Sequence, residues 1–374
     1  MRFTVSSTQL SSRLNALSKV INSKNSMPIL DCFLFEVHDG MLTITASDSE
    51  NTLKSEIMLD EYNENGSFCI TSRTILDAVK ELAEQPINID VDMNTMQTNI
   101  IYRNGIYSIV SLPSDEYPQP TPLLDDQKTI TLTGALMAEN LTRSLFATAQ
   151  DELRPIMNGV YFDLRPDGLS IVATDGHKLV RNTIFTVTSD EPAAFILPKK
   201  PANILKNVLL KDESEVVIKF DGRNANISFA DGNLICRLIE GRYPNYNSVI
   251  PTNNSNHVTI DRKIFLGMIK RVLPFASDSS QLIRINVRKD NLEVSSEDID
   301  FSTRAKEECI CEYDGVPMSI GFKGSTLIEV LSNLSSEDII IQLADSARAG
   351  LIIPAQQPEN EDVLMLMMPM LLND

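Results

Sequence analysis

The chain has few residues of the types that most often carry catalysis or bind metals. It has three histidines (His38, His177 and His257) and five scattered cysteines among 374 residues. So few histidines leave little material for acid–base catalysis. Cys309 and Cys311, the closest cysteine pair, lack the further ligands of a zinc site, and no phosphate loop of the form GxxxxGK(S/T) occurs. We therefore expect no catalytic site, no metal and no cofactor.

Long apolar runs are also missing. No stretch reaches 18 consecutive apolar residues, so the sequence predicts no transmembrane helix. The opening segment Met1–Val5 alternates as a β-strand does and lacks the apolar core of a signal peptide. Five scattered cysteines, an odd number, are typical of reduced thiols. We therefore expect a cytoplasmic protein that does not associate with membranes.

Basic residues are scarce relative to acidic ones. The chain has 33 Lys and Arg against 51 Asp and Glu, a formal net charge of −18. This acidity argues at first against nucleic acid, because a general polyanion binder is usually basic. The composition, 43% hydrophobic and 22% charged, is otherwise that of a globular protein. The length suggests two or three domains.

What the sequence does contain is one pattern repeated three times. Each copy opens with a short alternating strand, at Phe3–Val5, Thr129–Leu132 and His257–Ile260. An amphipathic helix, a hairpin, a second helix and further alternating strands follow. The hairpin turns are predicted at Asp39-Gly40, Asp167-Gly168 and Asp290-Asn291. Equivalent landmarks recur after 123 to 128 residues, a period that indicates a repeated domain.

The apolar stripes place six helices within residues 8–24, 71–85, 134–149, 198–211, 261–278 and 322–334. Stripes of this width are typical of helix faces that pack on a core. Turn-rich stretches at 113–128 and 251–256 are typical of linkers. We therefore predict an α+β protein of three tandem domains, at 1–125, 128–250 and 256–374. Each has two helices and a mainly antiparallel sheet.

Charge is unevenly divided between the helices and the rest of the chain. The six helical windows carry 15 Lys and Arg against 7 Asp and Glu, a net charge of +8, which leaves −26 elsewhere. One explanation is chance, because Lys and Arg favour helices, although Glu favours them equally. The other is a helical surface that faces a polyanion and contacts phosphates without reading sequence. On this interpretation the acidic remainder repels non-specific attachment.

Several motifs together resemble those of the bacterial DNA sliding clamp family, the β subunit of DNA polymerase III. They are Ala173–Leu179 (ATDGHKL), Gly241–Tyr246 (GRYPNY), Asn158-Gly159, Met368-Pro369-Met370, Met1–Val5 and Met27–Leu30. The resemblance covers essentially the whole chain and implies the DNA clamp fold. It implies a processivity factor for DNA replication without catalysis of its own. Such a protein is a homodimer whose head-to-tail ring encircles double-stranded DNA of any sequence and tethers the replicative polymerase.

The resemblance also implies a hydrophobic cleft between the second and third domains. Such a cleft binds short peptide motifs of the polymerase, the clamp loader and repair proteins. Its residues are Met157, Thr174, Gly176, His177, Lys178, Leu179, Pro244, Val249, Met367, Met368, Pro369, Met370 and Leu371. Flexible, polarisable methionines suit a surface that accepts several partners. The apolar segment Leu364–Leu372 is also explained by a buried final strand, and we expect it to be partly that.

Contacts with DNA follow from the same resemblance, at Lys24, Arg73, Gln150, Arg154, Lys199 and Lys200. Lys199 and Lys200 lie at the start of a predicted helix, where the macrodipole disfavours cations. A purely structural role is therefore less expected for them. For Arg73, a solvated helix face is an equally good explanation.

The chain departs from the family pattern in places. Lys178 stands where arginine is common, Pro155-Ile156 replaces two aromatic residues, and Leu371-Leu372 replaces a basic–apolar ending. Asn373 and Asp374 extend past the usual terminus. These departures leave the preferred peptide motif open.

Two other classes of protein fit the sequence less well. A hydrolase would use Ser170, Asp175 and His177, but nothing in the sequence orders them as nucleophile, base and orienting group. An acidic peptide-binding scaffold that never encloses DNA has no use for basic helices. The charge distribution therefore argues against the scaffold.

Overall fold

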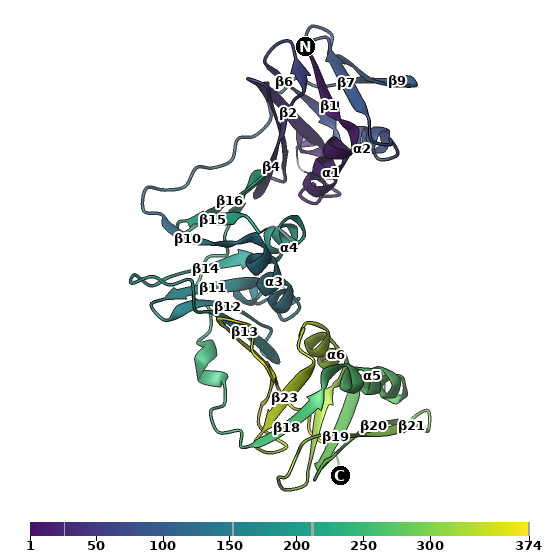
Figure 1. Ribbon diagram of the computed structural model, residues 1–374, viewed down its shortest axis with the longest axis vertical. Coiled ribbons are helices and arrows are strands. Elements are labelled where there is room, and N and C mark those ends of the chain that lie inside the picture. The colour runs from purple at the N-terminus through teal and green to yellow at the C-terminus, as the bar shows by residue number, and fades with distance from the viewer. Residues whose placement is uncertain (26, 152, 211–212, 373–374) are drawn as a thin grey trace. The chain divides into compact units, whose positions relative to one another are not determined.

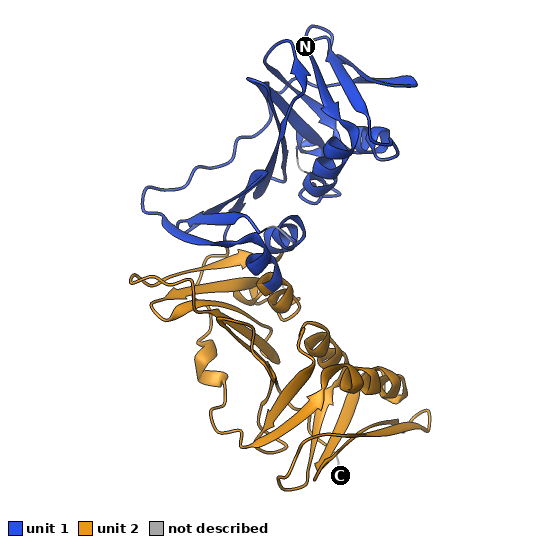
Figure 2. Cartoon of the chain, in the orientation of Figure 1, with its two compact units in different colours: residues 1–139, 200–238 blue, residues 140–199, 239–374 orange. Residues whose placement is uncertain are grey.

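The computed structural model describes residues 1–25, 27–151, 153–210 and 213–372. The chain forms two compact units, drawn in different colours in Figure 2. Unit 1 contains residues 1–139 and 200–238, and unit 2 contains residues 140–199 and 239–374. Asn373 and Asp374, whose role the sequence leaves open, lie outside the described residues.

Unit 1 contains two antiparallel sheets (Figure 1). The five-stranded sheet has the order β5 (Glu61–Tyr62), β1 (Arg2–Ser6), β7 (Pro86–Val91), β8 (Gln97–Tyr102), β9 (Gly105–Val110). The eight-stranded sheet has the order β10 (Lys128–Thr133), β15 (Glu215–Phe220), β16 (Asn224–Phe229), β17 (Gly232–Arg237), β4 (Asn51–Met58), β3 (Met41–Ser47), β2 (Cys32–His38), β6 (Gly66–Thr71). Helices α1 (Ser7–Leu17) and α2 (Ser72–Val79) pack against each other.

Unit 2 repeats this arrangement with one eight-stranded and one four-stranded sheet. The first has the order β14 (Ala193–Pro198), β11 (Gly159–Arg165), β12 (Gly168–Thr174), β13 (Lys178–Ile184), β25 (Glu361–Met367), β24 (Gly350–Pro354), β23 (Asp338–Leu343), β18 (Asn256–Asp261). The second has the order β21 (Thr303–Ile310), β20 (Asn291–Asp298), β19 (Leu282–Arg288), β22 (Met318–Lys323). Helices α5 (Arg262–Val272) and α6 (Gly324–Ser332) pack together.

The described residues form six α-helices; the remaining two are α3 (Gly134–Leu145) and α4 (Lys199–Val208). Side-chain caps explain where two helices begin. Ser6 accepts a hydrogen bond from the Gln9 amide (3.2 Å), and Asp261 accepts one from the Ile264 amide (2.8 Å). Such caps satisfy amides that have no partner inside the helix.

The predicted helices are longer than the observed ones. The apolar stripe of the first predicted helix runs on to Ile21, yet α1 ends at Leu17. Lys19 and Val20 then donate their amides three residues back, to Ala16 and Leu17, as a chain in turns does. Apolar residues past the last helical turn still pack on the core. Hydrophobic periodicity therefore continues after the helical hydrogen bonds have ended.

One predicted hairpin turn is confirmed in position and two are wrong by one residue. His38 pairs with Met41, which leaves Asp39 and Gly40 in the turn with φ of 49° and 84°. In the second and third hairpins the turn residues are Pro166-Asp167 and Lys289-Asp290. Gly168 and Asn291 instead begin strands. Gly168 has φ of 148°, and a Cβ there would lie 2.8 Å from the Ile184 carbonyl oxygen, so the site requires glycine.

Both eight-stranded sheets combine strands from two consecutive repeats. In unit 1, β17 pairs with β4 (Leu234 opposite Leu53), and in unit 2, β25 pairs with β13 (Met365 opposite Val180). The second repeat therefore contributes half a sheet to each unit. This explains why the compact units do not coincide with the predicted domains, whose exact boundaries stay a prediction.

Apolar side chains fill the space between helices and sheets. Leu10, Leu14 and Leu17 of α1 are fully buried, as are Phe265 and Ile269 of α5. All five cysteines carry free thiols. Among the described residues, no helix has the length and apolarity that crossing a membrane requires.

Candidate partner-binding and nucleic-acid interfaces

The hairpin between β12 and β13 is held in one conformation by its own side chains. Asp175 Oδ1 accepts hydrogen bonds from the amides of His177 (2.8 Å) and Lys178 (2.9 Å). Thr174 Oγ1 donates to the Lys178 carbonyl (2.7 Å) and accepts from the Gly176 amide (3.1 Å). Gly176 has φ of 91°, a conformation that favours glycine. Gly176 and His177 are exposed on this preformed loop, while Thr174 and Leu179 are buried.

The C-terminal strand β25 lies directly beside this hairpin. Lys178 is opposite Met367, and the Met368 amide donates to the His177 carbonyl (2.9 Å). The strand is buried through Met367, which is 2% exposed, whereas Met368 is 45% and Leu371 is 85% exposed. The expectation that the segment is partly a buried strand is therefore confirmed for its first half. The second half, from Met368 to Leu372, displays apolar side chains next to the hairpin, with Pro369 and Met370 half-buried.

The segment Gly241–Ile250, which precedes the predicted linker at 251–256, is anchored on strand β11 by two tyrosines. The ring of Tyr243 stacks on that of Tyr161, with centroids 4.4 Å apart. The hydroxyl of Tyr246 donates to Asp163 Oδ2 (2.7 Å). Burial, with the hydrogen bond to Asp163, raises the pKa of Tyr246 to about 12. The anchors leave Pro244 half-buried and Val249 56% exposed.

Met157 and Arg154 come from the short helix η2 (Pro155–Met157) and the residue before it. Arg154 Nη1 donates to the Asp175 carbonyl (3.0 Å), so its side chain supports the hairpin. The carbonyl of the half-buried Met157 accepts from the Ala149 amide (2.9 Å). The sequence assigned Arg154 to DNA, whereas the structure brings it to the exposed hairpin.

Lys178 links the hairpin to the next helix pair. Its Nζ lies 2.6 Å from Glu329 Oε2 in α6, 3.8 Å from Asp175 Oδ2, and 5.5 Å from the centre of the Phe146 ring. The cation therefore has two carboxylates and an aromatic face within reach. Sequence reasoning missed Glu329 and Phe146, because neither lies near the motif in the chain.

The residues predicted to contact DNA differ in how free they are. Lys24, Arg73 and Gln150 are exposed; the side chain of Arg73 is 92% exposed, and its Nε lies 3.9 Å from Asp77 Oδ2. Lys199 is half-buried and donates to the Ala149 carbonyl (2.5 Å). Burial lowers the pKa of Lys199, and the nearby charge of Lys178 lowers it further.

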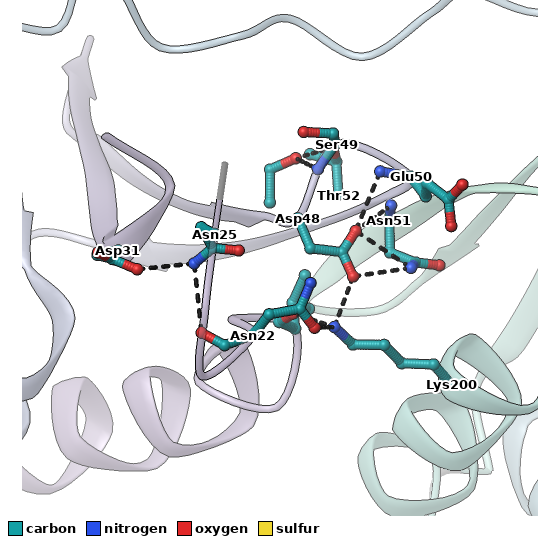
Figure 3. A network of polar contacts seen from close by, with 11 residues as sticks. Asn22, Asn25, Asp31, Asp48, Ser49, Glu50, Asn51, Thr52 and Lys200 are labelled. Carbon is teal, nitrogen blue, oxygen red and sulfur yellow. Dashed lines mark hydrogen bonds and ion pairs between the residues drawn. The ribbon is translucent and has the colours of Figure 1, made fainter. Parts of the chain in front are cut away.

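Lys200 belongs to a polar network around Asp48 within unit 1 (Figure 3). Its Nζ donates to the Val20 carbonyl, to Asn22 Oδ1 (2.7 Å) and to Asp48 Oδ2 (2.5 Å). A lysine ammonium has three N–H donors, and all three are used. A contact between Lys200 and a DNA phosphate therefore requires that one of these bonds break. The structural role that the sequence made less expected for Lys200 is the role the structure shows.

The helices keep their positive charge when the observed bounds replace the predicted windows. They carry ten Lys and Arg against three Asp and Glu, a net charge of +7. Part of this charge is paired: Arg13 with Asp231 (2.7 Å), Arg143 with Glu361 (2.9 Å) and Arg271 with Glu307 (2.6 Å). Lys263 and Lys270 of α5 are exposed.

Comparison with known proteins identifies the family. Three family models cover nearly the whole chain: the N-terminal, central and C-terminal domains of the DNA polymerase III beta subunit match residues 1–121, 131–245 and 247–371. The beta sliding clamps of Synechococcus elongatus and Salmonella typhimurium are each 26% identical to the chain. The matches cover 95% and 99% of this chain and 96% and 100% of those proteins.

Solved structures agree with this result. The DNA polymerase III beta subunit of Thermotoga maritima superposes with a TM-score of 0.90 at 27% identity. A sliding clamp of Pseudomonas aeruginosa bound to griselimycin superposes with a TM-score of 0.93 at 24% identity. Both cover all of this chain and all of theirs.

The fold and the matches together define the class of the protein as a three-domain DNA sliding clamp, a processivity factor without catalytic activity of its own. The chain belongs to the DNA polymerase III beta subunit family.

Proposed function

We propose that two copies of the chain join head to tail in a ring around duplex DNA, and that the ring captures peptide segments of its partners at the hairpin of residues 174–179. DNA is held by enclosure and by few phosphate contacts, among them Lys24 and Gln150. Dense contacts would hinder sliding and make retention depend on salt.

The proposal of a ring rests on how the edge strands of consecutive repeats pair. The last strand of the second repeat, β17, pairs with β4 of the first, and the last strand of the third repeat, β25, pairs with β13 of the second. By the same rule β9, the last strand of the first repeat, needs β21 of a third repeat. Both β9 and β21 are edge strands. A chain with one edge of each kind associates head to tail. In a ring of two chains, each β9 edge is paired with the β21 edge of the other chain.

Exposed apolar side chains on these edges support the pairing. Ile106 and Val110 on β9 are 56% and 74% exposed, and Ile310 on β21 is 86% exposed. Unpaired edge strands with apolar side chains favour association with another chain.

Sedimentation and light scattering test the dimer. At micromolar concentration the mass should be about twice 41.6 kDa. Val110→Asp and Ile310→Asp should each shift the protein towards monomer. Met58→Asp is a matched control, because Met58 is 76% exposed on β4, a strand already paired on both sides. A wild-type monomer at this concentration would refute the ring.

The peptide site rests on the apolar segment from Met368 to Leu371 beside a rigid hairpin. Its exposed Met368 adjoins the hairpin, because the Met368 amide donates to the His177 carbonyl (2.9 Å). Exposed apolar side chains beside a rigid loop suit the apolar anchors of an extended peptide, and we include Gly176, Pro244 and Val249 in the site. Arg154 contributes by supporting the hairpin. The partners are the replicative polymerase, the clamp loader and repair proteins.

A truncation after Met367 tests the site while it preserves strand β25. A fluorescein-labelled peptide from the clamp-binding segment of the replicative polymerase should lose at least 100-fold in affinity, with no change in dimer mass. Phe185→Ala is the control, because Phe185 is 50% exposed and directly follows β13, at the end of the strand opposite Lys178. Unchanged affinity of the truncated protein would contradict the assignment.

A further inference from the structure

The three repeats place an aspartate at one equivalent position. Strands β3, β12 and β20 begin at Met41, Gly168 and Asn291, directly after the two turn residues of their hairpins. Seven residues later stand Asp48, Asp175 and Asp298. In each case Oδ1 accepts an amide of the following turn: Asn51 (2.7 Å), Lys178 (2.9 Å) and Phe301 (3.2 Å). In the first hairpin Asp48 Oδ2 also accepts from Asn51 Nδ2 (3.0 Å) and still binds a further partner, Lys200.

The second helices of the repeats are equivalent in the same way. The strand before each helix ends opposite the first residue of its partner strand, as Thr71 does to Cys32 and Pro198 to Gly159. The second helical residues are therefore Arg73 in α2, Lys200 in α4 and Ser325 in α6.

Each junction inside the chain is closed by an ion pair between a hairpin and the second helix of the next repeat. In the first, Lys200 of α4 reaches Asp48 Oδ2, on a side chain that is only 5% exposed. In the second, where Ser325 carries no charge, Lys178 of the hairpin reaches Glu329 of α6. The helix supplies the cation in the first pair and the carboxylate in the second, but both pairs join a hairpin to the second helix of the next repeat.

The hairpin of the third repeat has the equivalent carboxylate, Asp298, but among the described residues no lysine or arginine pairs with it. Asp298 is 9% exposed, yet no Lys or Arg nitrogen within the described residues lies within 4.0 Å of its oxygens. It lines an open hollow of about 990 Å³ together with Glu297, Asp300 and Arg304. A buried carboxylate without a cation is costly. Arg73, at the position of Lys200, is 92% exposed.

We propose that Asp298 of one copy and Arg73 of a second copy form the ion pair that closes the junction between chains, as Asp48 and Lys200 do within the chain. This rests on the head-to-tail dimer proposed above and assigns Arg73 to the partner chain, where the sequence assigned it to DNA. Arginine suits the site, because its planar fork pairs with both oxygens of a carboxylate.

Charge reversal tests the pair in the full-length protein. The dimer dissociation constant is measured by sedimentation velocity and by subunit exchange between fluorescently labelled dimers, without DNA. Arg73→Glu and Asp298→Arg should each weaken the dimer at least tenfold, about 1.4 kcal/mol, and the double reversal should recover most of the loss. Asp298→Arg could also disturb the fold of the hairpin. Asp298→Asn is therefore a second variant, because it removes the charge and keeps an oxygen that can accept the Phe301 amide. It should weaken the dimer about fivefold.

Lys24→Glu is the matched control, since it makes the same charge change at a residue predicted to contact DNA. It should reduce affinity for a primed duplex and leave the dimer unchanged. If Arg73→Glu behaves like Lys24→Glu, Arg73 is a DNA contact and the pair is refuted. A wild-type dimer with unaffected variants refutes the pair alone, whereas a monomeric wild type refutes the ring itself.

Discussion

The two hairpins of residues 47–52 and 174–179 have the same backbone design and different exposure. In unit 1, the carboxylate of Asp48 binds Lys200 and is almost fully covered. In unit 2, Asp175 is 26% exposed, and Lys178 Nζ lies closer to Glu329 (2.6 Å) than to Asp175 (3.8 Å). The C-terminal segment then lies against the second hairpin through the bond between Met368 and His177. The cation comes from the helix in the first ion pair and from the hairpin in the second, and the second hairpin is the more exposed of the two.

The two ion pairs, Asp48–Lys200 and Lys178–Glu329, should stabilise their hairpins to different extents, because their carboxylates differ in exposure. Lys200→Met leaves a carboxylate that is 5% exposed without its cation, which costs about 2 kcal/mol of local stability. Lys178→Met leaves Glu329, which is 46% exposed, and costs about 0.5 kcal/mol. Hydrogen exchange of amides in each hairpin measures both values. Equal loss of protection in the two hairpins would contradict the comparison.

The position after each aspartate sharpens the contrast. Ser49 and Gly176 are equivalent and have φ of 79° and 91°. Gly176→Ala should destabilise its hairpin by about 1 kcal/mol, because side chains disfavour this conformation. Ser49→Gly should stabilise the other hairpin by about 0.5 kcal/mol. Thermal unfolding combined with hydrogen exchange measures both changes, and changes of the same sign would argue against equivalent loops.

A hydrogen bond from a tyrosine to a carboxylate distinguishes the segment Gly241–Ile250 from the first linker. Tyr246 donates to Asp163, whereas the corresponding place in the first linker is Pro120. The folded state raises the pKa of Tyr246 from the ordinary value of about 10 to about 12, so the folded form holds the proton more tightly. The stability that the Tyr246 hydrogen bond gives the folded state is fully present below pH 10 and is lost as pH rises towards 12.

Tyr246→Phe should therefore flatten the pH dependence of protection in residues 246–250 between pH 10 and 12. At pH 7 the variant should lose about 1 kcal/mol of local stability, since one hydrogen bond is missing. An unchanged alkaline profile would show that another group controls this region.

Local patterns in the sequence predicted the elements well. Hydrophobic periodicity located all three repeats, and the motif Ala173–Leu179 located the exposed hairpin of residues 174–179. Helix ends at Ile21 and the turns at Gly168 and Asn291 were missed by small shifts, because apolar periodicity and turn composition extend past hydrogen-bonded boundaries. The partners of Lys200 and Lys178 could not be predicted this way, since Asp48 and Glu329 are about 150 residues distant. Aligning the repeats by strand register would have shown Asp48, Asp175 and Asp298 as one position.

The measurement that tests the central claim most directly is retention on circular DNA. Protein loaded by its clamp loader onto a nicked circle should survive high salt, because enclosure does not depend on phosphate contacts. Cutting the circle once should release it. Equal loss from circular and linear DNA in high salt would show that the chain is held by contacts and contradict the ring.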